Sequence, residues 1–280
     1  MRAFVLIFAI AAIFVSPAMA ADISGHVQSV QPVQKLISGG DMLDLGIVGP
    51  GQKIEIEIAR TSGINDFRNV EEVWDRLKID DATLPLFWRS EYSLRYEANP
   101  KAFVIVDKGA PDGEYSFSLH TERDYGTASQ YPVRFNAKVR ISRDVFSLKV
   151  LSKFVQGGVE QPSEFTLELA NKGSANDAFE LEVVSGLPNA WKFKKQVFIP
   201  HGESRIVTYE VVSKEQVDAE VEFHATSLSS DTIYGTDTAS LQTRSSVLQD
   251  MRSVGNGVIL FPNIEQVVYY LMGFIANNFI

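Results

Sequence analysis

Lys53-Ile54-Glu55-Ile56-Glu57-Ile58 alternates charged and apolar side chains without a break. Because successive side chains of a β-strand point to opposite faces of the sheet, this period of two predicts a strand with one buried face. The pattern recurs between about residue 28 and residue 245, as in residues 114–119, 133–139, 165–169 and 205–211. The chain is therefore predicted to be an all-β protein.

Turn signals separate these short strands, at Gly49-Pro50-Gly51, Pro111-Asp112-Gly113, Asn171-Lys172-Gly173 and His201-Gly202. Short alternating strands with such punctuation are typical of β-sandwiches. A chain of 280 residues is long for a single core, and one alternating strand ends near Ser142-Arg143-Asp144 just before another begins. We predict two sandwich domains in tandem, residues 21–143 and 144–245.

One stretch departs from the strand pattern. Val70, Val73, Trp74 and Leu77 recur at helical spacing among acidic and basic residues. This spacing predicts a short amphipathic helical insertion near residues 65–86 of the first domain.

Residues 157–212 carry three turn motifs in a distinctive order. An Asn171-Lys172-Gly173 turn follows an alternating strand, Leu187-Pro188-Asn189-Ala190-Trp191 ends the next strand, and Pro200-His201-Gly202-Glu203-Ser204 precedes another. This order resembles the immunoglobulin-like module associated with α-galactosidases and other secreted proteins, although the proline of the last turn is displaced to Pro200. The resemblance implies an immunoglobulin-like fold, an extracellular setting and a buried Trp191, and it conveys no active site. The turn Gly49-Pro50-Gly51-Gln52 before the strand at residues 53–58 resembles the same module more weakly. From this we expect a second immunoglobulin-like domain.

The first twenty residues have the features of a signal peptide. Arg2 is the only early charge, residues 3–15 are apolar, and Ala18-Met19-Ala20 offers small residues for cleavage. We expect residues 1–20 to form a signal-peptide helix and the mature chain to begin at Ala21. Retention of this segment as an anchor is the alternative. Cysteine is absent, so the exported protein is expected to fold without disulfides.

Residues 258–280 form a second hydrophobic segment, with Glu265 as its one formal charge. It is long enough to span a bilayer as a helix, and residues 246–257 would be its tether. At helical spacing one stripe is apolar and is expected to face the membrane: Ile264, Val267, Val268, Leu271 and Ile275. The segment could span, lie in the interface or pack on protein.

Composition and motifs argue against nucleic-acid binding, catalysis and a metal site. A formal net charge of -9 disfavours nucleic acid as a partner. Cysteine is absent, which excludes cysteine catalysis and thiolate metal sites. The four histidines never pair at metal-ligand spacing. No Gly-x-Ser-x-Gly, His-Glu-x-x-His or phosphate-loop motif is present, and nothing in the sequence singles out a serine triad. The chain is therefore predicted to be non-catalytic, with no cofactor and no metal site.

Aromatic residues gather around Phe87, and a ligand site is expected at Trp88, Arg89, Glu91 and Tyr92. An exposed ring flanked by arginine and glutamate could stack on a sugar, whereas the alternative is that Phe87 and Tyr92 belong to the core. We expect an exported, membrane-associated structural or interaction protein of the cell envelope, on the extracellular face, anchored or peripheral. Its partners would be membrane lipid through the C-terminal helix and either another envelope protein or a glycan. A secreted carbohydrate-binding accessory module is the alternative function.

Overall fold

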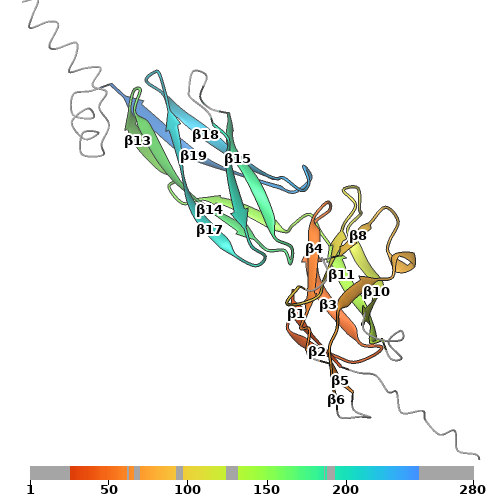
Figure 1. Cartoon of the computed structure of the whole chain (residues 1–280). Coiled ribbons are helices and arrows are strands. Elements are labelled where there is room, and N and C mark those ends of the chain that lie inside the picture. Colours follow the sequence, from red (N-terminus) through yellow and green to blue (C-terminus); the bar gives the residue numbers. More distant parts are fainter. Residues whose placement is uncertain are drawn as a thin grey trace, which may run out of the picture.

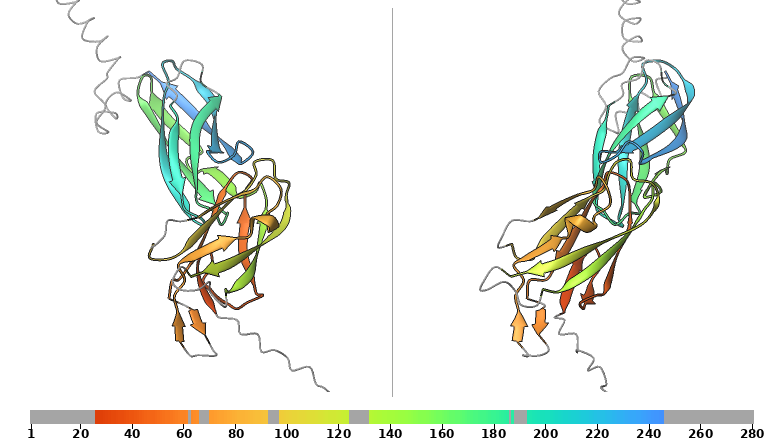
Figure 2. Two further views of the ribbon diagram at one scale, coloured as in Figure 1. Left: turned by 45° about the vertical axis from the view of Figure 1, so that its right-hand side comes forward. Right: turned by 90° about the vertical axis from the view of Figure 1, so that its right-hand side faces the viewer.

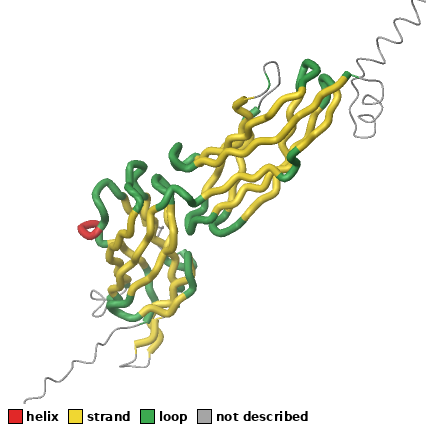
Figure 3. The backbone as a smooth tube through the Cα atoms, turned by 180° about the vertical axis from the view of Figure 1, so that it is seen from behind, coloured by secondary structure: helices red, strands yellow, loops and turns green. Residues whose placement is uncertain are grey.

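The computed structural model describes residues 26–61, 63–65, 70–92, 97–123, 132–185, 187 and 193–245. Within these residues the chain is all-β, as predicted, apart from the single 3-10 turn η1 (Asp81–Thr83). That turn is the red segment in Figure 3. Strands up to Ile141 pair only with one another, and strands from Phe146 onward do likewise. We call residues 26–141 the N-terminal part and residues 145–245 the C-terminal part.

The N-terminal part has two larger sheets and a small hairpin (Figure 1). The β4 sheet has the order β2-β1-β4-β9-β8, and the β11 sheet has the order β3-β11-β10-β7. β5 pairs with β6 in the hairpin. The strands are β1 (Val27–Gln31), β2 (Lys35–Ile37), β3 (Met42–Val48), β4 (Lys53–Ile58), β5 (Gly63–Asn65), β6 (Val70–Glu72), β7 (Arg76–Ile79), β8 (Arg89–Tyr92), β9 (Lys101–Ile105), β10 (Gly113–Glu122) and β11 (Arg134–Ile141).

Strand order in this part matches the immunoglobulin arrangement. β1, β4, β9 and β8 follow the order A-B-E-D, and β11, β10 and β7 follow G-F-C. Trp74 is fully buried just before β7, the place of the immunoglobulin core tryptophan. The Tyr115 hydroxyl, near the start of β10, donates to the Pro111 carbonyl at 3.0 Å, as in the tyrosine corner of that fold.

The C-terminal part repeats the arrangement with small differences (Figure 2). The β14 sheet is β12-β14-β17, and the β18 sheet is β13-β19-β18-β15-β16. The immunoglobulin letters are A-B-E for the first and G-F-C for β19, β18 and β15, with β16 added beside C. The strands are β12 (Phe146–Val150), β13 (Phe154–Gly158), β14 (Pro162–Asn171), β15 (Asp177–Ser185), β16 (Lys195–Ile199), β17 (Ser204–Val212), β18 (Asp218–Ser227) and β19 (Tyr234–Arg244).

Alternation in the sequence explains both cores. In β4, Ile54 and Ile56 are fully buried between the sheets while Lys53 is exposed. In the C-terminal part, aromatic rings from facing strands stack, with Phe146 and Phe179 at 3.9 Å between centroids and Phe165 edge-on to Phe223 at 5.0 Å. Such aromatic pairs stabilise a core beyond their buried area. Burial therefore takes the place of disulfides, which this chain cannot form.

The Asn171-Lys172-Gly173 turn forms where it was predicted, between β14 and β15. The Asn171 side chain is buried and donates to the carbonyls of Ala175 and Ile199 at 2.8 and 3.1 Å. Its oxygen accepts from the Gly173 N–H at 3.0 Å. One amide thus ties the end of β14 to the start of β15 and the end of β16.

The helical insertion expected near residues 65–86 is wrong. The described residues of this stretch form the end of β5, then β6, β7 and η1. Trp74, Leu77 and Ile79 are buried, and Leu77 and Ile79 alternate along β7, which pairs with β10. Apolar residues three or four apart also fit a strand that follows a bend, so spacing alone did not separate the two structures.

The two parts meet where the loop between β3 and β4 approaches the β14–β15 and β18–β19 turns (Figure 1). The Ser174 N–H donates to the Ile47 carbonyl at 2.7 Å. A Cβ on Gly49 would lie 2.3 Å from Ile233 Cδ1, and one on Gly51 would lie 2.5 Å from the Ser229 carbonyl oxygen. The parts therefore touch closely through positions that only glycine can occupy without displacement.

Candidate functional site

The predicted ligand residues lie on and before β8, at the edge of the β4 sheet. Asp80 caps η1 by accepting from the Ala82 N–H, and Thr83 Oγ1 accepts from the Ser118 N–H at 2.8 Å. The chain then turns at Pro85, whose carbonyl accepts from the Trp88 N–H at 3.2 Å. This anchored turn projects the segment that we call the Leu86–Tyr92 edge: Leu86, Phe87, Arg89, Glu91 and Tyr92.

Trp88 does not belong to the exposed surface. Its side chain is 7% exposed and packs on Tyr115 with ring centroids 5.2 Å apart. The indole therefore anchors the segment in the core and offers no face to a ligand. The prediction of Trp88 as a ligand-site residue with an exposed ring is corrected by this burial.

Arg89, Glu91 and Tyr92 do lie together on β8 and are exposed. Glu91 accepts a hydrogen bond from Lys53 Nζ at 2.5 Å. The Tyr92 hydroxyl donates to the Ile79 carbonyl at 3.2 Å while 42% of the residue stays accessible. The polar groups of Glu91 and Tyr92 are thus engaged within the fold.

The sequence interpretation missed how far Leu86 and Phe87 protrude. They are 78% and 74% exposed, so the alternative that placed Phe87 in the core is wrong for that residue. Phe87 also has a φ of 68°, which is unusual for a bulky side chain. The run Leu84-Pro85-Leu86-Phe87 breaks the apolar and polar alternation, and that break is the one local signal that the segment leaves the sheet.

Charged side chains cover the outward face of the β4 sheet in pairs. Lys101 Nζ lies 2.6 Å from Glu55 and 3.3 Å from Glu57. The hydrogen bond to Glu55 raises the pKa of Lys101 above its ordinary value, against the opposing effect of burial. Lys53 lies 4.2 Å from the centroid of the Phe103 ring as well as on Glu91. The ammonium groups of Lys53 and Lys101 are therefore both engaged by carboxylates of this face.

A buried polar network joins the two parts. The Asp177 carboxylate accepts hydrogen bonds from Gln52 Nε2 at 2.7 Å, Ser227 Oγ at 2.6 Å and Ser229 Oγ at 2.8 Å. Gln52 Oε1 in turn accepts from the Gly49 N–H at 2.8 Å. Gln52 is fully buried and Asp177 is 4% exposed. The network fixes the junction because a buried polar group left without its partner is costly.

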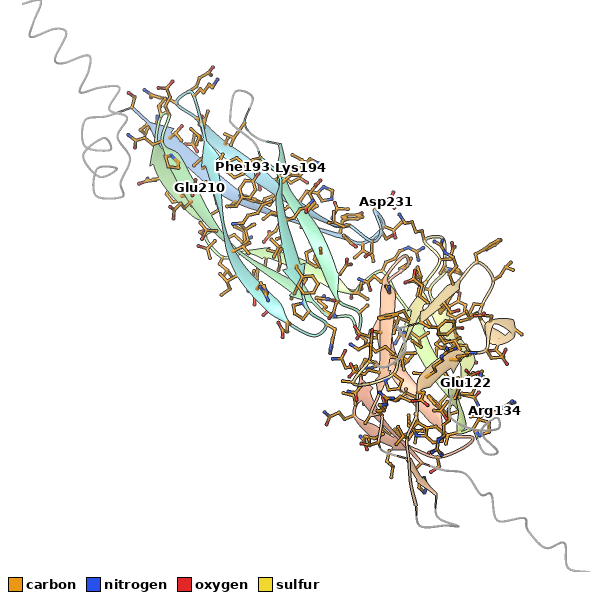
Figure 4. The ribbon with its side chains drawn as sticks, viewed as in Figure 1. Glu122, Arg134, Phe193, Lys194, Glu210 and Asp231 are labelled. Atoms are coloured by element: carbon orange, nitrogen blue, oxygen red, sulfur yellow. The ribbon has the colours of Figure 1, made fainter. Side chains whose placement is uncertain are left out.

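The described residues also line a cleft and a groove. A cleft of about 270 Å³ at the junction is lined by both parts: Gln31, Pro32, Lys53, Glu55, Phe103, Ser174, Asn176 and His201. A groove of about 480 Å³ on the β11 sheet is bordered by Asp80, His120 and Arg134, of which Arg134 is labelled on the N-terminal part in Figure 4.

Several predicted sites lie outside the described residues: Trp191, the signal peptide of residues 1–20, and the tail of residues 258–280 with Ile264, Val267, Val268, Leu271 and Ile275. Among the described residues, no helix is long and apolar enough to cross a membrane. The same part of the chain holds no group of three or more metal-ligating side chains.

Comparison with known proteins finds no matching family model and no matching curated protein. The resemblance of residues 157–212 to the α-galactosidase-associated module therefore stays a prediction.

Solved structures show distant likenesses. The Yersinia pseudotuberculosis adhesin InvE is 11% identical, with 78% of this chain and 60% of that chain covered and a TM-score of 0.27. The D00-D0 domain of intimin is 12% identical, with 77% and 98% covered and a TM-score of 0.24. A chimeric titin Z1Z2 is 12% identical, with 80% and 99% covered and a TM-score of 0.36. These scores are too low to support an argument about function, so the immunoglobulin-like assignment depends on the strand order of this chain's own sheets.

Proposed function

We propose that the chain is an exported, non-catalytic interaction protein of the cell envelope, held at the membrane by residues 258–280. Its interacting region would be two immunoglobulin-like domains in tandem, residues 21–143 and 144–245. Residues 1–20 would direct export and residues 246–257 would be the tether. The supports are the export-like N-terminus, the apolar tail and the architecture of the described residues.

The tandem arrangement is supported by pairing and packing. Two separate hydrophobic clusters divide between Ile141 and Val145, with only Ala175 of the C-terminal part in the first cluster. Each part carries a set of strands in immunoglobulin order. A short connection and a buried network at the junction would keep the pair extended and stiff.

The Leu86–Tyr92 edge is the observation on which the interaction role depends. Two large apolar side chains in succession, Leu86 and Phe87, are about three-quarters exposed. Water disfavours such exposure, and exposed apolar groups rimmed by polar ones mark interaction sites. A residue held at positive φ is strained, and strain of this kind concentrates at functional positions. Leu86 and Phe87 would therefore be the anchors that a protein partner buries.

The junction cleft favours a second candidate, a secreted carbohydrate-binding module. Phe103 supplies an aromatic surface there, and Gln31, Ser174 and Asn176 supply hydrogen-bonding groups. Small-molecule sites combine apolar walls with a few polar groups and often lie between domains. A glycan bound in this cleft, with no partner on the Leu86–Tyr92 edge, would favour this alternative.

The test replaces Phe87 with a photo-crosslinking phenylalanine analogue in the full-length chain, expressed in its own organism. We expect crosslinked adducts, recovered in the membrane fraction, because Phe87 would lie in an interface. Truncation after Gly257 should move the folded protein to the soluble fraction. Treatment with alkaline carbonate then separates a spanning tail, which resists extraction, from an interfacial one, which is released.

Val33, an apolar residue that is 47% exposed on the same part, is the matched control position for the crosslinker. Equal crosslinking at Val33 and Phe87, or none at either, would contradict the interaction role of the edge. If the full-length protein stays soluble without lipid and the truncated one unfolds, the tail packs on protein and the membrane anchor is wrong.

A further inference from the structure

The outward face of the β18 sheet carries an apolar patch. Inward residues such as Phe179, Leu181 and Phe223 are fully buried, so the residues between them point to solvent. Phe198, Leu228 and Tyr234 on this outward side are 55%, 51% and 58% exposed. Isolated exposed apolar residues are normal, whereas a group of them indicates an interface.

Strand register shows that these side chains form a group. Phe198 is paired with Ala178, and the Leu228 N–H donates to the Ala178 carbonyl at 2.8 Å. Tyr234 is paired with Thr226, two residues from Leu228, which makes Tyr234 and Leu228 diagonal neighbours. We call Phe198, Ala178, Leu228 and Tyr234 the Phe198 patch. It lies at the end of the sheet that faces the N-terminal part.

Acidic residues lie on the same face as the patch. Glu180 is paired with Thr226, beside the patch, and Glu182 follows on β15. Glu222, Glu220 and Asp218 continue along β18 toward the far end of the sheet. Asp231 lies in the β18–β19 turn, three residues from both Leu228 and Tyr234, at the end of the C-terminal part that faces the N-terminal part (Figure 4). Against these carboxylates, the described part of the face offers Lys194 near the patch and Arg244 at the far end of β19 as outward cations, and the His224 ring lies against Tyr234 with centroids 5.5 Å apart. Lys194 is already held by Glu180 at 2.5 Å and Glu182 at 3.4 Å.

The negative charge of this face decides which kind of molecule could bind the patch. A second copy of the chain would bring Glu180 and Glu182 against a protein whose formal net charge is also -9, and like charges across an interface are unfavourable. Anionic lipid is disfavoured by the same repulsion. A positively charged protein surface meets no such penalty, and it gains from complementary potentials.

We propose that the Phe198 patch binds a basic partner protein that places apolar side chains against Phe198, Leu228 and Tyr234 and cationic side chains against the nearby carboxylates of Glu180, Glu182 and Asp231. This surface is separate from the Leu86–Tyr92 edge and lies on the other part of the chain. A negative binding result at the Phe198 patch is therefore distinguishable from a negative crosslinking result at the Leu86–Tyr92 edge.

The experiment titrates the full-length chain into a fluorescent peptide of alternating lysine and leucine and follows anisotropy. The probe offers one cationic and one apolar face when extended. Replacing Phe198 and Leu228 together with serine should weaken binding about tenfold or more, because each apolar side chain buried in an interface contributes on that scale. Glu180→Gln with Glu182→Gln should weaken binding less and reduce its dependence on salt.

Ile206→Ser is the matched control, because Ile206 is 67% exposed but lies on β17 of the other sheet. It should leave the affinity unchanged, and Tyr234→Thr replaces the double variant if that variant melts earlier than the parent by circular dichroism. Unchanged binding by the patch variants, an equal loss from Ile206→Ser, or equal affinity for an alternating glutamate and leucine peptide would overturn the proposal. A dimer of the chain that the patch variants abolish would overturn it in favour of a second copy.

Discussion

At the scale of single residues, Phe87 combines exposure with a backbone conformation that suits glycine. A residue with a Cβ loses about 1–2 kcal/mol in the left-handed region, whereas glycine does not. Phe87→Gly should therefore be more stable than Phe87→Ala by about 1 kcal/mol, after allowing for the greater freedom of glycine in the unfolded chain. Chemical denaturation of the two variants measures this difference. The side chain itself contributes little, because it is 74% exposed.

The same pair of substitutions at Leu86, which has no positive φ, is the control. There alanine should be the more stable variant. If glycine and alanine are equivalent at position 87, the residue is not held in the left-handed region, and the argument from strain for a functional edge fails.

At the scale of elements, Asp237 on β19 links the two sheets of the C-terminal part. Its carboxylate accepts from the Val150 N–H of β12 at 2.7 Å and from Lys153 Nζ at 2.7 Å. Burial alone would raise the pKa of Asp237, but the hydrogen bonds from Lys153, Val150 and Thr238 outweigh it and hold the pKa below 3.8. A carboxyl with a lowered folded pKa stabilises the fold above its ordinary pKa, and this contribution is lost as the pH falls through the folded value.

Asp237→Asn should therefore destabilise the protein at neutral pH by about 1–3 kcal/mol, the range for hydrogen bonds to charged groups. The difference from the parent should shrink in acid, which denaturant titrations at several pH values below the ordinary pKa would show. Asp112→Asn is the matched control, because Asp112 pairs with Arg143 at an exposed position and should change stability by less than about 1 kcal/mol. A constant difference across pH would contradict the linkage.

At the scale of the whole molecule, the contact between the two parts depends on Gly51. Both Gly51 and Gly40 have positive φ, at 78° and 84°, so alanine at either position meets the same backbone strain. A Cβ on Gly51 would also lie 2.5 Å from the Ser229 carbonyl oxygen, whereas nothing lies within 4 Å of one on Gly40. Gly51→Ala should therefore cost about 1–3 kcal/mol more than Gly40→Ala, the range for overpacking.

Denaturant unfolding of both variants measures the excess, and small-angle scattering should show the two parts of Gly51→Ala moving apart. Equal effects of the two substitutions would mean that the parts do not approach each other at Gly51.

The all-β class and many strand positions follow from local sequence, because a period of two is a local property that a sheet of any topology must satisfy. The strand predicted at residues 53–58 is β4 itself, and the turn at Asn171-Lys172-Gly173 forms as expected. The tertiary structure decided the rest. Trp88 is covered and Phe87 is exposed, although they are adjacent, because the turn after η1 directs one into the core and the other into solvent. Gln52 and Asp177 are 125 residues apart and meet in a hydrogen bond only because both parts fold and pack, and no local pattern encodes such a contact.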